Sequence, residues 1–189
     1  SKRLNVCGCE FNYVDETPSD PIEFLSSETA ESSAREYLKG LNISTKHMVL
    51  KEINALEDGS YSVTFYQQFG GRLIFEDYVT IVLSPEGVTS MWGYLLVPRE
   101  FSRQNLSIRQ ITGILIDFVR NEDRPKGRTI HIENISLGYR VDRSKTDIKE
   151  TSAFPVWRIT TDDCEDYYYE ATTGRYISNQ SGAVLNYLR

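Results

Sequence analysis

The chain has 189 residues, of which 40% are hydrophobic and 12% aromatic, and its formal net charge at pH 7 is −6. This length suits one large or two small domains, and the hydrophobic content is too high for a disordered tail. The acidic charge argues against nucleic acid or an anionic membrane as a partner, and no apolar run reaches the roughly 18 residues of a membrane-spanning helix.

The first half of the chain is predicted to contain one helix followed by strands. We interpret residues 1–26 as an irregular N-terminal lead-in, because the segment 17–21 (Thr-Pro-Ser-Asp-Pro) interrupts both helix and central strand. Helical spacing of apolar residues from Ser27 predicts a helix that ends near Gly40. Alternation then predicts strands over residues 48–56, 61–69, 78–83 and 88–97, with turns at 57–60 and 84–87.

The second half repeats this order of elements. Ser107 followed by Gln110 has the spacing of a capping box, which predicts a helix over Ile108–Arg120 with an apolar stripe. The apolar residues of the next strand, 129–141, change from even to odd positions, which predicts a β-bulge near Glu133-Asn134. Further strands are predicted around 154–159, 167–171 and 175–188, with a turn at 172–174.

Helix, strand, strand, strand, turn and strand therefore occur twice in the same order. Alternation leaves one apolar face on each sheet, which a single helix can cover. We predict an α+β fold of two tandem units, each an antiparallel meander covered by one helix. The lead-in occupies residues 1–26, and the units occupy residues 27–98 and 105–188.

The candidate contact residues lie in the second unit. Trp157 and Ile159 share one face of their strand, so Arg158 points to the other and is either exposed or paired with a carboxylate. Tyr167, Tyr168 and Tyr169 alternate between faces, and core packing explains at least part of this run. Protein contact is the alternative, because exposed tyrosines are frequent binding hot spots. We therefore name these tyrosines and Arg158 as candidate protein-contact residues.

No catalytic or metal-binding constellation stands out in the sequence. His47 and His131 are predicted on strand surfaces, and residues 162–166 (Asp-Asp-Cys-Glu-Asp) as a solvated hairpin tip rather than a calcium site. The cysteines are Cys7, Cys9 and Cys164. With no second cysteine pair to complete a zinc site, we favour free thiols, or one bridge to Cys164. We predict a non-enzymatic protein with no metal and no cofactor.

Several segments resemble the YycI family over roughly residues 50–180. They are 137–139 (Leu-Gly-Tyr), 155–159 (Pro-Val-Trp-Arg-Ile), 168–169, Ala171 and Gly174, and 61–67 (Tyr-Ser-Val-Thr-Phe-Tyr-Gln) in the first half. A looser likeness to YycH and to PepSY-type units covers the same repeats. The resemblance implies a membrane-anchored protein of Gram-positive-type bacteria, whose domain lies outside the cytoplasmic membrane. It also implies binding to a YycH-like protein and to the sensor kinase of the YycFG (WalKR) cell-wall system, and modulation of that kinase.

These expectations leave several hypotheses open. The first is an extracytoplasmic regulator that binds other proteins through sheet faces or edges. The second is a PepSY-like inhibitor or chaperone of a secreted peptidase, and the third is a cell-wall or small-ligand binding domain. Members of the family carry an N-terminal transmembrane helix, so we expect any anchor to lie outside this sequence. Dimerisation with a like or unlike partner also stays open.

Overall fold

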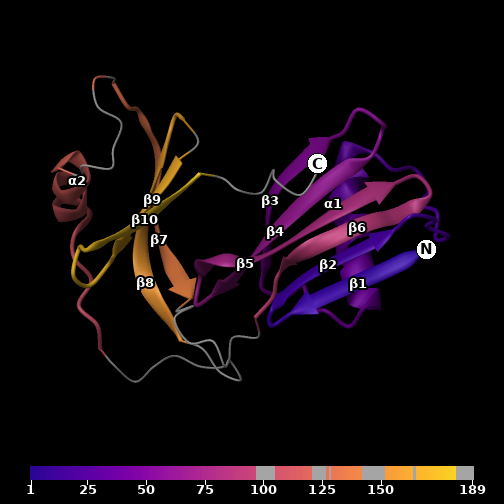
Figure 1. Cartoon of the computed structure of the whole chain (residues 1–189), viewed down its shortest axis with the longest axis horizontal. Coiled ribbons are helices and arrows are strands. Elements are labelled where there is room, and N and C mark those ends of the chain that lie inside the picture. The colour runs from indigo at the N-terminus through magenta and orange to yellow at the C-terminus, as the bar shows by residue number, and fades with distance from the viewer. Residues whose placement is uncertain (97–104, 121–126, 128, 142–151, 164, 182–189) are drawn as a thin grey trace. The chain divides into compact units, whose positions relative to one another are not determined.

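The computed structural model describes residues 1–96, 105–120, 127, 129–141, 152–163 and 165–181. Contacts between Cα atoms divide the chain into two compact units, unit 1 (Ser1–Arg99) and unit 2 (Glu100–Arg189). Both contain antiparallel strands and a helix, so the predicted α+β class is confirmed (Figure 1).

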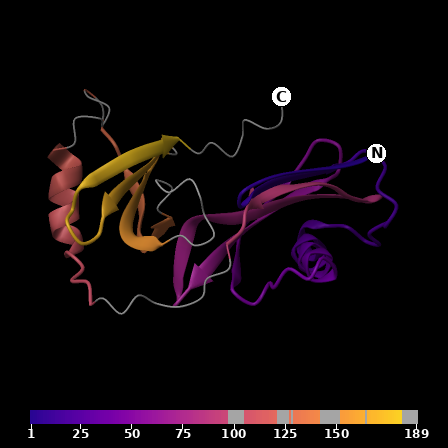
Figure 2. The ribbon, with the colours of Figure 1, turned by 60° about the horizontal axis from the view of Figure 1, so that its bottom comes forward.

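Unit 1 combines a helix with an antiparallel sheet whose strands follow the order β1-β2-β6-β5-β4-β3 (Figure 1). The helix α1 lies against one face of this sheet (Figure 2). The elements are β1 (Lys2–Cys7), β2 (Glu10–Asp15), α1 (Ser27–Gly40), β3 (Met48–Ala55), β4 (Tyr61–Phe69), β5 (Arg72–Ser84) and β6 (Gly87–Tyr94).

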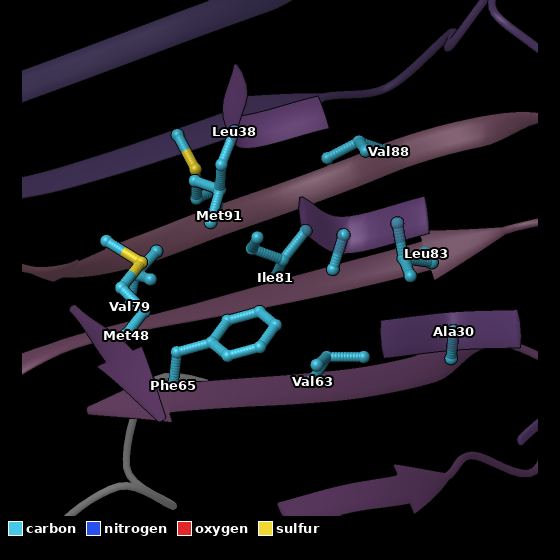
Figure 3. Close-up of a cluster of buried hydrophobic side chains, with 11 residues drawn as sticks. Ala30, Leu38, Met48, Val63, Phe65, Val79, Ile81, Leu83, Val88 and Met91 are labelled. Carbon is cyan, nitrogen blue, oxygen red and sulfur yellow. The ribbon is translucent and has the colours of Figure 1, made fainter. Parts of the chain in front are cut away.

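The core of unit 1 lies between α1 and the sheet. Ala30, Ala34 and Leu38 follow one another at four-residue spacing, so they line one face of α1, and all are fully buried. The facing strands contribute every second side chain, among them Val63 and Phe65 of β4 (Figure 3). Because the first two of these three positions are alanines, the helix backbone can approach the sheet closely.

The predicted irregular lead-in is wrong for its first part, because residues 2–15 form the hairpin of β1 and β2. Gly8 has φ +62° and supplies the turn. Phe11 and Tyr13 pack against the unit 1 core, and β2 pairs with β6, which lies far later in the chain. Those long-range contacts stabilise a hairpin whose two short strands carry little local signal.

Unit 2 combines a helix with an antiparallel sheet in the order β7-β8-β9-β10, and α2 lies along one side of this sheet (Figure 2). The predicted β-bulge is confirmed, because the pairing register of β7 shifts between Ile132 and Asn134. The fully buried core residues include Ile114 from α2, Ile159 from β8, and Tyr167 from β9. The elements are α2 (Ile111–Arg120), β7 (Ile132–Val141), β8 (Ala153–Thr161), β9 (Glu165–Glu170) and β10 (Tyr176–Ser181).

Helix α2 starts later than its apolar spacing predicts, and the capping box at Ser107 is wrong. Arg109 is held in place by other bonds: its N–H donates to the Ala171 carbonyl at 2.8 Å, and its carbonyl accepts the Trp157 indole N–H at 3.1 Å. The first helical bonds run instead to the carbonyl of Gln110. Ile108 consequently lies outside the helix and is exposed.

Several strand limits also differ from the prediction. β5 begins at Arg72, before the predicted start at Tyr78. β6 and β7 are shorter than predicted, at Gly87–Tyr94 and Ile132–Val141. The predicted strand 175–188 corresponds to β10 at its start, and its residues from 182 onward lie outside the described part of the chain.

Candidate interaction surface

Two of the candidate tyrosines belong to the core of unit 2. Tyr167 and Tyr169 point toward α2, as alternation along β9 predicts, and both are buried. The Tyr167 ring meets the ring of Phe118 edge-on, with centroids 5.1 Å apart, and Tyr169 lies 5.3 Å from the ring of Tyr176. Core packing therefore accounts for Tyr167 and Tyr169, and their proposed role as contact residues is not supported by their position.

Tyr168 points to the opposite face of the sheet. Its ring carries the guanidinium of Arg140 at 4.5 Å from the centroid, a cation–π distance. Its hydroxyl donates to Asp166 Oδ2 at 3.3 Å. These contacts leave Tyr168 only 4% exposed, so little of its side chain is accessible to a partner.

Arg158 lies beside Tyr168 on this face and pairs with a carboxylate, which is the second of its two predicted environments. Its Nη1 lies 3.8 Å from Asp166 Oδ2, and its Nε donates to Ser136 Oγ at 3.3 Å. The Thr160 hydroxyl also donates to Asp166, at 2.6 Å. Asp166 thus accepts hydrogen bonds from Thr160 and Tyr168 and faces the charge of Arg158.

We call this group the Arg158 cluster. β8 places Arg158 opposite both Ser136 of β7 and Tyr168 of β9, so the register of the sheet assembles it. A guanidinium held between a carboxylate and a hydroxyl can fix the strands to one another and present charge at the rim of a contact surface. Its members are Ser136, Arg140, Arg158, Thr160, Asp166 and Tyr168.

Unit 1 holds a buried carboxylate that the sequence analysis missed. Asp77 in β5 is fully buried, and its Oδ2 has no hydrogen-bond partner in the described part of the chain. Burial raises its pKa to about 7, against the smaller opposing effect of the Leu96 N–H, which donates to Oδ1 at 3.3 Å. The Leu96 carbonyl accepts a bond from the Gln67 side chain at 2.8 Å. Asp77 and Gln67 thereby hold the chain where it leaves β6.

The histidines, the cysteines and the loop 162–166 are the other candidates that the sequence offered for chemistry. His47 and His131 are exposed, and His131 precedes β7 rather than lying within it. The described part of 162–166 forms the connection between β8 and the start of β9, as predicted. Cys7 and Cys9 carry free thiols at the β1–β2 turn, while Cys164 lies outside the described residues. Across the described ranges, no group of three or more His, Cys, Asp or Glu residues is placed to hold a metal ion.

A family model described as "YycI protein" matches residues 4–172. The chain belongs to the YycI family. The match confirms the predicted resemblance over residues 50–172 and extends it toward the N-terminus, through α1 to the β1–β2 hairpin. Membership of the YycI family suggests a regulatory, non-enzymatic role outside the cytoplasmic membrane. Among the described residues of this YycI family member, neither helix has the length and apolarity needed to cross a bilayer.

Two solved structures are similar to the chain at low sequence identity. An uncharacterized protein from Eubacterium rectale ATCC 33656 has 12% identity and a TM-score of 0.56, over 95% of this chain and 76% of that one. The C-terminal domain of YpeB from Bacillus megaterium has 15% identity and a TM-score of 0.49, over 90% of this chain and 76% of that one. A search of curated proteins finds no match to this chain. The Eubacterium rectale structure therefore supports the fold alone.

Proposed function

We propose that this chain is an extracytoplasmic regulatory domain that modulates the sensor kinase of a cell-wall two-component system through protein–protein contacts. The observation that carries the proposal is the match of the YycI family model to residues 4–172. In this proposal the partners are a YycH-like protein and the kinase of the YycFG (WalKR) system. A membrane anchor outside this sequence would hold the domain at the cell surface.

The architecture supports a binding role. We infer that residues 27–98 and 105–188 are tandem PepSY-like units, each with one helix on one face of a meander. Such units offer sheet faces and sheet edges, which are surfaces that proteins commonly use to bind other proteins. Of the candidate contact residues, Tyr168 and Arg158 lie on the face of the sheet opposite α2, so the Arg158 cluster is the part of unit 2 that we assign to partner contact.

The test is binding of the whole chain to two purified domains: the extracytoplasmic sensor domain of the kinase and that of the YycH-like protein. We expect saturable binding to at least one of them, and a changed autophosphorylation rate when anchored chain and kinase share a vesicle. Arg158→Gln should weaken binding about tenfold if the cluster lies at the contact. Arg175→Gln is the matched control, because Arg175 pairs with Glu170 on an exposed turn.

Absence of binding to both domains, with the kinase rate unchanged, would contradict the regulator proposal. Inhibition of a secreted peptidase by the same chain would then favour the PepSY-like inhibitor or chaperone. Saturable binding of cell-wall fragments would favour the ligand-binding domain.

A further inference from the structure

The outer edge of the unit 1 sheet is formed by β1, whose side chains are accessible to solvent along the whole strand. Its residues are all exposed, and Leu4 and Val6 keep 62% and 64% of their surface in water. Leu4 lies opposite Tyr13 and Val6 opposite Phe11, so their side chains lie on the face of the sheet that packs against the core. The apolar face of the sheet therefore continues to its edge without cover from the described residues.

The hydrogen-bond pattern shows which backbone groups face outward. The N–H of Glu16 donates to the carbonyl of Ser1, so this pair is hydrogen-bonded across the hairpin. Every second pair of an antiparallel ladder is of this kind, which directs the backbone groups of Arg3, Asn5 and Cys7 toward β2. The N–H and C=O groups of Lys2, Leu4 and Val6 therefore point away from β2, and no described strand pairs with them.

The opposite edge of the same sheet, formed by β3, is protected against pairing with a further strand, unlike β1. β3 carries a β-bulge between Leu50 and Glu52, with the charged side chains of Lys51 and Glu52 at the bulge, 3.9 Å apart. A β-bulge is a device by which natural sheets prevent unwanted pairing at their edges, because it interrupts the register. β1 has an uninterrupted register with β2 and neither a proline nor a bulge.

We propose that the outer edge of β1 binds an extended segment of a partner protein by strand addition. The inference rests on the proposed function and deepens it by naming the surface. A peptide backbone matches the outward N–H and C=O groups of Lys2, Leu4 and Val6. Apolar side chains at alternate positions of the added strand would extend the Leu4 and Val6 face.

Charge adds a second requirement on the partner. β1 carries Lys2 and Arg3 and no acidic residue, within a chain whose net charge is −6. Both side chains are mostly exposed although they contact Asp15 and Glu16 at 3.4 and 3.0 Å. The added strand is therefore expected to alternate apolar residues with polar ones that include at least one carboxylate.

Proline substitution at an outward position tests the geometry. Leu4→Pro removes an N–H that faces away from β2, so it blocks strand addition and keeps the β1–β2 ladder. Val6→Pro repeats the test at the next outward N–H. Leu4→Thr is the matched control, because it removes apolar surface and retains the N–H. Continued protection of the Asn5 amide from hydrogen exchange in the free proteins verifies that the hairpin still forms.

The probe is a phage-displayed library of random twelve-residue peptides, selected on the immobilised whole chain. We expect alternating apolar and polar peptides that bind both proline variants at least about tenfold more weakly and Leu4→Thr within about threefold. Bound peptide should also protect the amides of Lys2, Leu4 and Val6 from exchange. Failure to select peptides, or peptides that bind the proline variants equally well, would overturn strand addition.

The purified sensor domain and YycH-like domain are measured on the same variants, which separates the two proposals. If neither domain binds the unaltered chain while edge-binding peptides are found, the regulator proposal fails and strand addition stands. If a domain binds but no peptide distinguishes the proline variants, strand addition fails and the regulator proposal stands.

Discussion

Asp77 places a carboxylate in β5 where water does not reach it, and this makes the stability of unit 1 depend on pH. Its pKa of about 7 in the folded protein lies above the ordinary value of 3.8. The protonated form is therefore favoured by folding, so its contribution is fully present below about pH 4 and is lost as pH rises through about 7. A shift of this size corresponds to at most roughly 4 kcal/mol.

We expect Asp77→Asn to remove most of this pH dependence. The variant should be more stable than the unaltered chain at pH 8 and similar to it at pH 4, because the amide cannot acquire a buried charge. Urea unfolding in a Trp157→Phe background measures this, since Trp92 then reports on unit 1. The exposed Asp20→Asn serves as the control and should leave the pH dependence unchanged. Equal pH slopes for Asp77→Asn and the unaltered chain would contradict the prediction.

Gly174 gives a second prediction for a single residue. It has φ +79°, and a Cβ built there would overlap Nη1 of Arg109. That nitrogen donates to the Thr173 carbonyl at 2.7 Å and to Asp117 at 3.0 Å. Gly174→Ala therefore incurs backbone strain and displaces a side chain that links α2 to the turn after β9. We expect a loss of about 2–3 kcal/mol in the free energy of unfolding.

Gly127→Ala is the matched control for Gly174→Ala. Gly127 has a similar φ of +81°, but among the described residues no atom lies within 4 Å of the added Cβ. Gly127→Ala should therefore lower the free energy of unfolding by about 1 kcal/mol, from backbone strain alone. Urea unfolding followed by Trp157 fluorescence in a Trp92→Phe background measures both variants in unit 2. If both alanines lose the same amount, the Arg109 contacts contribute nothing measurable.

The docking of α1 onto its sheet depends on small side chains at the contact. Ala34 is fully buried between the helix and the strands, so Ala34→Leu forces additional carbons into a filled space. We expect unit 1 to lose about 1–3 kcal/mol, measured by urea unfolding with Trp92 as reporter. Glu36→Leu adds a leucine to an exposed position of the same helix and should change stability by less than about 0.5 kcal/mol. Equal effects of the two substitutions would show that the helix does not pack as described.

At the scale of elements, the periodicity of apolar residues correctly predicts the helices and strands that depend mainly on local sequence. The alternation of β4 and the helical spacing of α1 identify both elements in the sequence, and the change of phase near Glu133-Asn134 identifies a bulge. The hairpin of β1 and β2 escapes prediction because β6, its pairing partner, lies far away in sequence. The start of α2 escapes it because a bond from Arg109 to Ala171 overrides the apolar spacing.

For the candidate surface too, local alternation predicts which face a side chain lies on, but not which residue it pairs with. Alternation places Tyr167 and Tyr169 on the core face and Arg158 on the other, and the structure confirms both. The partner of Arg158 could not be predicted, because the register of β8 against β9 brings Asp166 to it. Asp77 was missed because a carboxylate normally marks the end of a buried strand, whereas β5 continues on both sides of it.

For the whole molecule, net charge bears on how the chain would reach the membrane-bound kinase of the proposed function. The chain carries 27 acidic and 21 basic residues, so an anionic bilayer repels it on balance. The exposed apolar residues of α2, Ile116 and Val119, are accompanied by few basic side chains, unlike the basic face of an interfacial helix. Under the proposed function, contact with the kinase would therefore depend on an anchor and on protein surfaces rather than on attraction to lipid.

This leads to a prediction for the whole chain at a bilayer. Mixed with vesicles of phosphatidylglycerol at about 0.1 M salt, less than roughly a tenth of it should co-sediment, because its net charge opposes binding. The same chain fused to an N-terminal hydrophobic helix should sediment with the vesicles. Binding by the unfused chain that weakens as salt increases would show an electrostatic membrane site instead. In that case the basic residues of β1, Lys2 and Arg3, would be the first to replace by glutamine.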